Sequence, residues 1–295
     1  WILMLGVTGY LAYRLIGTIW AIPVFFLYGV IYSACNSKWH ECSHGTVFKT
    51  PWLNDVVYFI TGAMEFRDPV DFRWSHARHH SYTLMTQVDP EIVSPRPPKV
   101  LDIILDFFAI KGLLIAIKTL VMHSLGIPTK KVKEYVPKED YGRLAWGARG
   151  VLALHLIAVG LSIGFRSWLP VLYFTLARCY GAFFQWTFIL IQHVGRAENV
   201  WDHRICTRSL KVNPFLSNLF MNMENHIEHH IYPTVPFHAL PKLRERIKDQ
   251  LPQPYTSMID GIREVISAVF KQLKDPQYSA LSQLPDSPVN PSTDH

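Results

Sequence analysis

The stretch Leu15–Ser37, LIGTIWAIPVFFLYGVIYSACNS, has 23 consecutive residues without a charged side chain and leads directly into Lys38–His44, KWHECSH. About 20 apolar residues in a helix cross the hydrocarbon core of a bilayer, which is about 30 Å thick. The stretch therefore predicts a membrane span that ends at a pair of histidines, and it favours an all-α integral membrane fold.

The composition of the whole chain supports this interpretation. Of the 295 residues, 49% are hydrophobic and only 18% are charged, whereas soluble domains carry about a quarter. Such a composition argues against disorder, collagen and a disulfide scaffold. The four cysteines form no C-x-x-C pair, which argues against an Fe–S cluster and favours a reducing compartment. The net charge of +6 could indicate nucleic acid, but the apolar runs favour a membrane, and we expect no nucleic-acid partner.

Four spans in two helical hairpins are expected. They lie near residues 1–14, 15–37, 151–166 and 169–191. The chain opens on Trp1 without a signal-peptide n-region, so we expect its natural start to be missing and the first span to be the visible end of a longer helix. Residues 1–275 form a single membrane domain in this interpretation, and the polar, proline-bearing residues 276–295 are expected to be a flexible tail.

The basic residues predict the orientation of the hairpins. Arg14 and Arg166 are the only ones in the two hairpin turns, whereas residues 38–149 and 192–275 contain nearly all the others. Positive charge stays on the cytoplasmic side of membrane proteins. We therefore expect a helical cap in the cytoplasm, at the bacterial inner membrane in preference to the ER membrane.

The apolar segment Val100–Gly126 does not fit a fifth span. As a span it would place the histidine groups described next on opposite sides of the membrane. We therefore expect one helix that lies flat in the membrane interface.

Eight of the 14 histidines fall in three tight groups. These boxes are His40-Glu-Cys-Ser-His44, His76-Ala-Arg-His79-His80 and His226-Ile-Glu-His229-His230. Spacings of three and four residues place the imidazoles of a group on one face of a helix. Neutral imidazole is a good ligand for iron, zinc or copper, so the boxes predict a metal site. His193, just after the fourth span, is a candidate ninth ligand, and we expect the five histidines that stand alone to be structural or exposed. These are His123, His155, His203, His238 and His295.

Two other functions could use such histidines. His40–His44 matches H-E-x-x-H, the zinc-protease helix in which the glutamate is the general base. An intramembrane zinc protease would leave the other clustered histidines without a role. A metal transporter would instead place its ligands inside the spans, where His155 is the only histidine. Both are retained as distant alternatives.

The order HECSH, RWSHARHHSYT and NHIEHHIYP, followed by VPFHALPKL, resembles the membrane fatty-acid desaturase and hydroxylase family. The resemblance covers the chain from the second span to about Pro254 and implies a histidine-ligated di-iron centre that activates O2 and attacks an unactivated C–H bond. Its implied ligands are His40, His44, His76, His79, His80, His193, His226, His229 and His230. No protein acid or base is assigned beside the centre. Glu41, Asp71 and Glu228 are candidates for orienting the ligands.

The resemblance favours a desaturase that acts on a fatty-acyl or lipid chain. The alternative is a hydroxylase, or an O- or N-demethylase, of a lipid or a small amphipathic substrate, because the boxes do not encode the placement of the substrate. The sequence contains no dinucleotide-binding, haem-binding or four-cysteine motif. We therefore expect a separate electron donor, which would be a ferredoxin, a rubredoxin or a cytochrome with its reductase.

Arg178 is the one charged residue inside the expected fourth span. A charge near mid-span is costly, by roughly 2.5–3.5 kcal/mol on insertion scales, and usually faces a helix bundle or a polar cavity. We favour a pairing between helices over a role at the deep end of a substrate channel.

Overall fold

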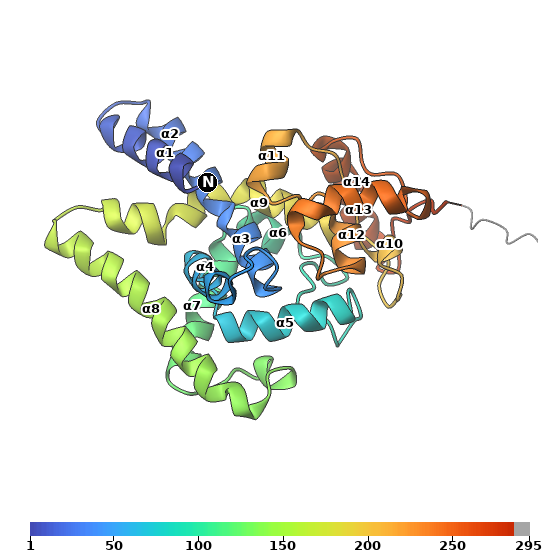
Figure 1. Ribbon diagram of the computed structural model, residues 1–295, viewed down its shortest axis with the longest axis horizontal. Helices are drawn as coiled ribbons and strands as arrows, with labels where there is room; N and C mark the ends of the chain where they lie inside the picture. Colours follow the sequence, from blue (N-terminus) through green and yellow to red (C-terminus); the bar gives the residue numbers. More distant parts are fainter. Residues whose placement is uncertain (286–295) are drawn as a thin grey trace, which may run out of the picture.

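This computed structural model describes residues 1–285 of the chain. The described residues form helices joined by loops and include no strand, as expected for an all-α fold (Figure 1). The α-helices are α1 (Ile2–Arg14), α2 (Ala21–Ser33), α3 (Cys35–Ser43), α4 (Pro51–Met64), α5 (Pro69–Ser81), α6 (Val100–Asp106), α7 (Ile110–Ser124), α8 (Tyr141–Gly164), α9 (Ala177–His193), α10 (His203–Cys206), α11 (Pro214–Leu219), α12 (His226–Ile231), α13 (Leu240–Ile247) and α14 (Met258–Lys274).

Helices α1 and α2 form the first expected hairpin, but the second helix begins later than expected (Figure 1). The turn covers residues 15–20, where Gly17 has a φ of +88° and the Thr18 hydroxyl donates to the Leu15 carbonyl at 2.8 Å. The second helix therefore begins at Ala21 and not at Leu15, because an uncharged turn leaves no mark in a hydropathy pattern. Each helix has 13 residues, or about 20 Å, which is less than the bilayer core.

The second hairpin is longer than the sequence predicted. Two helical segments, Lys138–Gly164 and Val171–His193, are long and apolar enough to cross a membrane. Helix α8 begins at Tyr141, ten residues before the uncharged run, because its first turns pack on the rest of the protein. Arg149 in this part donates from Nε to the Ser124 carbonyl at 2.9 Å.

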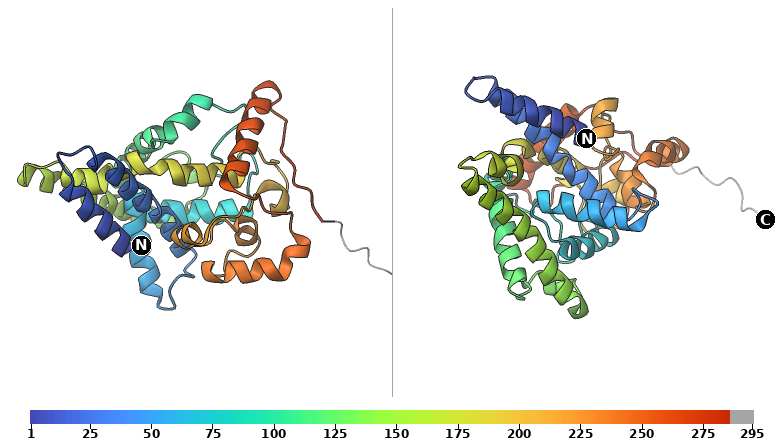
Figure 2. Two further views of the ribbon diagram at one scale, coloured as in Figure 1. Left: turned by 90° about the horizontal axis from the view of Figure 1, so that it is seen from above. Right: turned by 60° about the vertical axis from the view of Figure 1, so that its left-hand side comes forward.

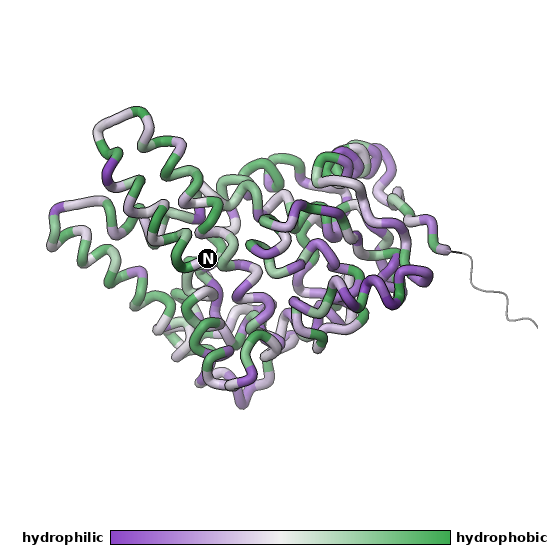
Figure 3. The backbone as a smooth tube through the Cα atoms, turned by 45° about the horizontal axis from the view of Figure 1, so that its top comes forward, coloured by the Kyte–Doolittle hydropathy of each residue, from purple (hydrophilic) through white to green (hydrophobic). Residues whose placement is uncertain are grey.

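Apolar residues gather on the two hairpins, whereas polar residues dominate the opposite end of the molecule (Figure 3). Large apolar side chains on the hairpins are exposed, among them Ile22 at 75% and Ile163 at 73%. Trp20 and Trp168, in the two hairpin turns, are also exposed. The molecule thus divides into an apolar hairpin end and a polar cap.

The two hairpins meet where α2 crosses α9 at two glycines. A Cβ atom on Gly181 would lie 1.9 Å from the Gly29 carbonyl carbon, so the backbones touch and neither position accepts a side chain. Beside the crossing, the Tyr32 hydroxyl donates to the Phe174 carbonyl at 2.7 Å. The crossing fixes the direction of both helices. Helix α2 leads into α3 with the first box, and α9 ends at His193.

The expectation of one helix over Val100–Gly126 is wrong. The segment breaks into α6 and α7 at residues 107–109, where Ala109 has a φ of +53°. Helix α7 lies alongside α8, and Leu120 packs in one apolar cluster with Ala148 (Figure 2). This contact packs the second part of the segment against the hairpin helix α8.

The first residues of the expected flexible tail are anchored to the cap. The Ala280 amide donates to the Gly195 carbonyl at 2.9 Å, and Gln272 Nε2 donates to the Tyr278 carbonyl at 3.0 Å. Arg96 also donates to the Tyr278 carbonyl at 3.1 Å. The remainder of the expected tail, residues 286–295, lies outside the described part of the chain.

We expect Gly181→Ala to lower the thermal unfolding midpoint of the purified protein, because a methyl group at the crossing forces α2 and α9 apart. Overpacking of this kind typically costs 1–3 kcal/mol. The matched control is Gly160→Ala on α8, where a Cβ meets nothing within 4 Å. Equal midpoints for the two variants, measured by scanning calorimetry in detergent, would show that the crossing does not constrain the fold.

Candidate metal centre

Four helices deliver the nine candidate histidines to one place. Helix α3 and its C-cap carry the first box, α5 the second, the end of α9 carries His193, and α12 carries the third box. The start of α5 is fixed locally, because Pro69 occupies its first turn and Asp68 accepts hydrogen bonds from the amides of Val70 and Asp71. Seven of the nine side chains are buried, while His40 and His44 are half-buried.

The histidines form two neighbouring groups. The possible ligand atoms within each group lie within 4.8 Å of one another. One group is His40, His44, His76, His80 and His229, and the other is His79, His193 and His230. His226 joins the second group, because its Nε2 lies 3.1 Å from Nε2 of His193 and 3.2 Å from Nε2 of His230. All nine predicted ligands therefore belong to one of two adjacent clusters.

Hydrogen bonds at Nδ1 orient five of the imidazoles. The acceptors are Glu41 for His40 (3.1 Å), Glu91 for His76 (3.0 Å), Asp89 for His79 (2.9 Å), the Cys206 carbonyl for His193 (3.3 Å) and the Thr83 hydroxyl for His230 (3.1 Å). Carboxylates and carbonyls only accept, and Thr83 already donates its hydroxyl to the His79 carbonyl at 2.7 Å. Each of these imidazoles is therefore protonated on Nδ1 and carries a lone pair on Nε2.

With this tautomer, the lone pairs of the second group face one another and repel unless a cation lies between them. The Nε2 lone pairs of His193 and His230 both point at Nε2 of His226, which can donate at most one hydrogen. At least one pair of lone pairs therefore faces at about 3 Å. In the first group, the buried Nε2 atoms of His40, His44 and His229 have no partner among the described residues. The donor set fits a bound metal ion.

Burial keeps most of these imidazoles neutral, which is the form that binds metal. It lowers the pKa of His40 and His44 to about 4 and the pKa of His76 and His229 well below the usual value. Burial acts in the same direction on His79, but the hydrogen bond and the charge of Asp89 outweigh it and raise the pKa of that imidazole. Neutral imidazole suits iron, zinc, copper and nickel.

The three carboxylates proposed from the sequence lie in different places. Glu41 is buried, and its Oε1 lies 3.1 Å from Nδ1 of His40 and 3.6 Å from Nδ1 of His229. Asp71 accepts from the Tyr135 hydroxyl at 2.5 Å, because five residues along α5 place it on the face opposite His76.

Glu228 is fully buried on the side of α12 away from the groups. It accepts from the Ser209 hydroxyl at 2.7 Å and pairs with Arg244. Among the described residues, neither Asp71 nor Glu228 forms a hydrogen bond with a box histidine.

Asp89 and Glu91 orient ligands and were missed from the sequence. They lie ten and fifteen residues after the histidines they hold, on a loop that folds back over α5. The Asp89 side chain is fully buried and also accepts from the Leu84 amide at 2.8 Å. The only available signal was a D-P-E stretch soon after the second box, because no helical spacing relates these residues to the histidines.

Of the histidines that stand alone in the sequence, one lies beside the histidine groups and three have other surroundings. His155 stacks on Phe66 and bonds to the Ala63 carbonyl at 3.0 Å, which is a structural role. His123 is buried, and His238 is exposed. His203, in contrast, lies beside the centre, with its ring centroid 5.3 Å from that of His230. His295 lies outside the described residues.

Arg178 pairs between helices, which was the favoured interpretation. Its Nε lies 3.3 Å from Oε2 of Glu65, and its NH1 donates to the Glu65 carbonyl at 2.7 Å. Glu65 is buried and also accepts from the Cys35 thiol at 3.2 Å. The guanidinium is thus held by the residue that follows α4.

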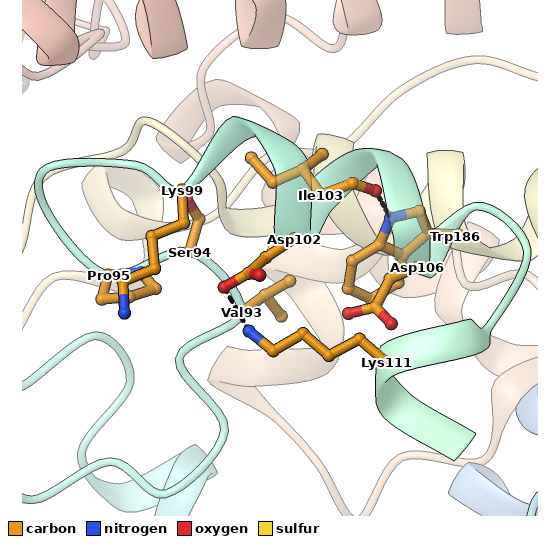
Figure 4. Close-up of a pocket in the computed structure, with 9 residues that line it drawn as sticks. All are labelled: Val93, Ser94, Pro95, Lys99, Asp102, Ile103, Asp106, Lys111 and Trp186. Carbon is orange, nitrogen blue, oxygen red and sulfur yellow. Dashed lines mark hydrogen bonds and ion pairs between the residues drawn. The ribbon is translucent and has the colours of Figure 1, made fainter. Parts of the chain in front are cut away.

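A small polar pocket of about 100 Å³ lies apart from the histidines, between residues 93–95, α6 and α9 (Figure 4). Asp102 pairs with Lys111 there, and Trp186 Nε1 donates to the Ile103 carbonyl at 3.2 Å. Sites for small molecules usually enclose about 300–1,000 Å³. This pocket is therefore too small for an acyl chain, and none of the candidate ligands lines it.

Comparisons with known proteins agree with this geometry. The model of the fatty acid desaturase family matches residues 17–261, a region that contains all nine histidines. The fatty acid conjugase FAC2 A of Calendula officinalis is 21% identical over 296 residues, and the alignment covers 90% of this chain and 76% of the relative.

We expect Asp89→Asn to weaken metal binding by 10- to 100-fold, because the substitution removes the charge that orients His79 and such outer partners usually contribute this much. Competition with a chelator measures the affinity. The control is Asp71→Asn on the outer face of the same helix, which we expect to bind metal normally. Unchanged affinity in Asp89→Asn, with folding verified by circular dichroism, would contradict the assigned role.

Proposed function

The chain belongs to the fatty acid desaturase family, and from this premise we propose that it is an O2-dependent membrane di-iron oxidoreductase that introduces a double bond into a fatty-acyl or lipid chain. The observation that supports this proposal most is the pair of adjacent histidine groups, in the second of which the lone pairs of His193 and His230 both face Nε2 of His226. The name of the conjugase relative is consistent with a fatty-acid substrate.

The proposal assigns one iron to each histidine group. His40, His44, His76, His80 and His229 would hold the first, and His79, His193, His226 and His230 the second. Bound iron would supply O2 reduction and the removal of hydrogen from an unactivated C–H bond. The reaction balances when two hydrogens of the acyl chain, O2, two electrons and two protons give one double bond and two water molecules.

The protein's own residues prepare this chemistry in three ways. Asp89 and Glu91 keep Nδ1 of their histidines protonated, so that Nε2 is free to bind a metal. Burial keeps the ligands neutral and limits the access of water. The α2–α9 crossing fixes the directions of the two helices that lead to the first box and to His193. No side chain is assigned as an acid or a base.

The electrons are proposed to come from a separate carrier, which would be a ferredoxin, a rubredoxin or a cytochrome with its reductase. The membrane arrangement is proposed to comprise four spans in two hairpins, with the histidine groups in a cytoplasmic cap of the bacterial inner membrane or the ER. The hairpin turns hold only two of the 29 basic residues, Arg14 and Arg166, and this scarcity supports the orientation, because positive charge stays on the cytoplasmic side. The exposed Trp20 and Trp168 suit the opposite membrane interface.

The topology predicts which engineered cysteines react in intact cells. A cysteine at Ala77 or Lys242, both exposed on the cap, is expected to react with a membrane-impermeant maleimide only after permeabilisation. A cysteine at Gly17 or Arg166 is expected to react from outside. Cys35, Cys42 and Cys206 are buried, and the half-buried Cys179 is replaced by serine in the labelling background. Labelling of Ala77→Cys in intact cells would place the cap outside and refute the orientation.

The metal and the product are tested together. We expect the purified wild type to contain about two irons per chain and cells that express the gene to accumulate unsaturated lipid. His229→Ala removes a fully buried ligand and is expected to lower the iron content and abolish the product, whereas the exposed His238→Ala should do neither.

Elemental analysis and mass spectrometry of lipids measure both quantities. One zinc per chain without O2 consumption would favour a hydrolase or a metal transporter. An alcohol or a dealkylated product in place of a double bond would assign the chain to the hydroxylases or demethylases of the family.

A further inference from the structure

The segment 129–140 covers the outer face of α5, the helix whose inner face carries the second box. Three side chains of α5 each bond to it. The pairs are Asp71 with the Tyr135 hydroxyl (2.5 Å), Trp74 with Asp140 (2.9 Å) and Arg78 with the Glu134 carbonyl (2.8 Å). The segment is therefore separated from the histidine groups by the thickness of one helix, about 10 Å.

The first part of this segment is strongly basic. Lys130, Lys131 and Lys133 are all exposed, and one acidic residue, the exposed Glu134, follows them directly. Nζ of Lys131 donates to the Pro90 carbonyl at 2.5 Å. Pro90 lies between Asp89 and Glu91, the two carboxylates that hold His79 and His76. A continuous chain of contacts thus leads from exposed lysines to both histidine groups.

We propose that Lys130, Lys131 and Lys133, named here the lysine patch, form the docking surface for an acidic one-electron carrier protein. The inference rests on the proposed function, which requires electrons from outside the chain. A docked carrier is oxidised as it passes one electron to the iron centre, and two such encounters supply the two electrons of one turnover. Complementary charge steers this kind of transient encounter and raises its association rate.

The proposal commits to a protein partner, because the patch lies one helix away from the histidine groups to which electrons must be delivered. Val132 packs in one cluster with Leu144, near the start of the segment Lys138–Gly164 that can cross a membrane. An anionic lipid surface is therefore the alternative that the vesicle experiment below tests.

The basic helix α13, which packs on α12, is a weaker candidate. The charge of its Arg244 is already paired with that of Glu228. Its neighbour Lys248 pairs with Glu245 at 3.2 Å. Lys242 and Arg246 of α13 are exposed and form no ion pair among the described residues, so this helix also retains positive charge. The lysine patch is preferred because Lys131 contacts the carbonyl of Pro90, between the two carboxylates that hold His79 and His76.

The test compares Lys130→Glu/Lys133→Glu with a control of equal charge change on α13, Lys242→Glu/Lys248→Glu. Iron-loaded protein in nanodiscs receives electrons from a reduced plant-type ferredoxin, a rubredoxin or a cytochrome b5, each with its reductase. We expect the patch variant to raise KM for the best of these carriers at least tenfold at low salt, with kcat at saturation unchanged. The difference should shrink as salt is added.

Two further measurements separate docking from chemistry and from folding. A single turnover after chemical reduction of the iron needs no carrier and is expected to be the same in both variants and in the wild type. Carbodiimide cross-linking, which needs no turnover, should join carrier carboxylates to Lys130 or Lys133 in the wild type.

Equal KM values for the two variants, or a larger effect of the α13 variant, would overturn the proposal. So would binding of the patch to vesicles of phosphatidylglycerol with no change in KM. If the wild type contains no iron, or gives no product after chemical reduction, it is the proposed function that fails, and the two failures are thereby distinguished.

Discussion

The structure depends on bringing nine imidazoles together in a space where their lone pairs converge. Lone pairs at about 3 Å repel one another, and burial removes the water that could separate them. Protonation would not relieve this, because burial disfavours the charged imidazole. A bound cation is the arrangement that satisfies all the donors at once. The binding of that cation then stabilises the fold, since the unfolded chain does not offer such a site.

The rest of the fold can be understood as the means of maintaining that convergence. The glycine crossing of α2 and α9 joins two hairpins far apart in the sequence and directs α2 toward the first box and α9 toward His193. The loop with Asp89 and Glu91 then locks two imidazoles of α5 from the other side. The segment 129–140 holds α5 from outside through Arg78, whose Nε also donates to the Val88 carbonyl at 2.9 Å.

Much of this was predictable because helical periodicity is a local signal. The all-α fold, the paired hairpins and the eight box histidines follow from spacing and from runs of uncharged residues within one element, whereas His193 was added from its position after the fourth span and from the family resemblance. The second span was expected to begin at residue 15 and not at Ala21, because the turn at residues 15–20 is as apolar as its flanks. The break at Ala109 was missed because no glycine or proline marks it. Asp89, Glu91 and His203 could not be found, because only the tertiary fold brings a loop residue to a histidine on another helix.

The H-x-x-H-H pattern itself accounts for two neighbouring sites in place of one large site. On an α-helix, the fourth residue after a histidine is rotated by about 40° from it, whereas the third residue is rotated by about 60° in the opposite sense. His76 and His80 accordingly enter one group while His79 enters the other. On α12 the same pattern sends His226 and His230 to one group and His229 to the other. Because α5 and α12 each contribute to both groups, the width of one helix face sets the distance between the groups. Two metal ions bound there would be neighbours, and both would be displaced together by any movement of α5 or α12.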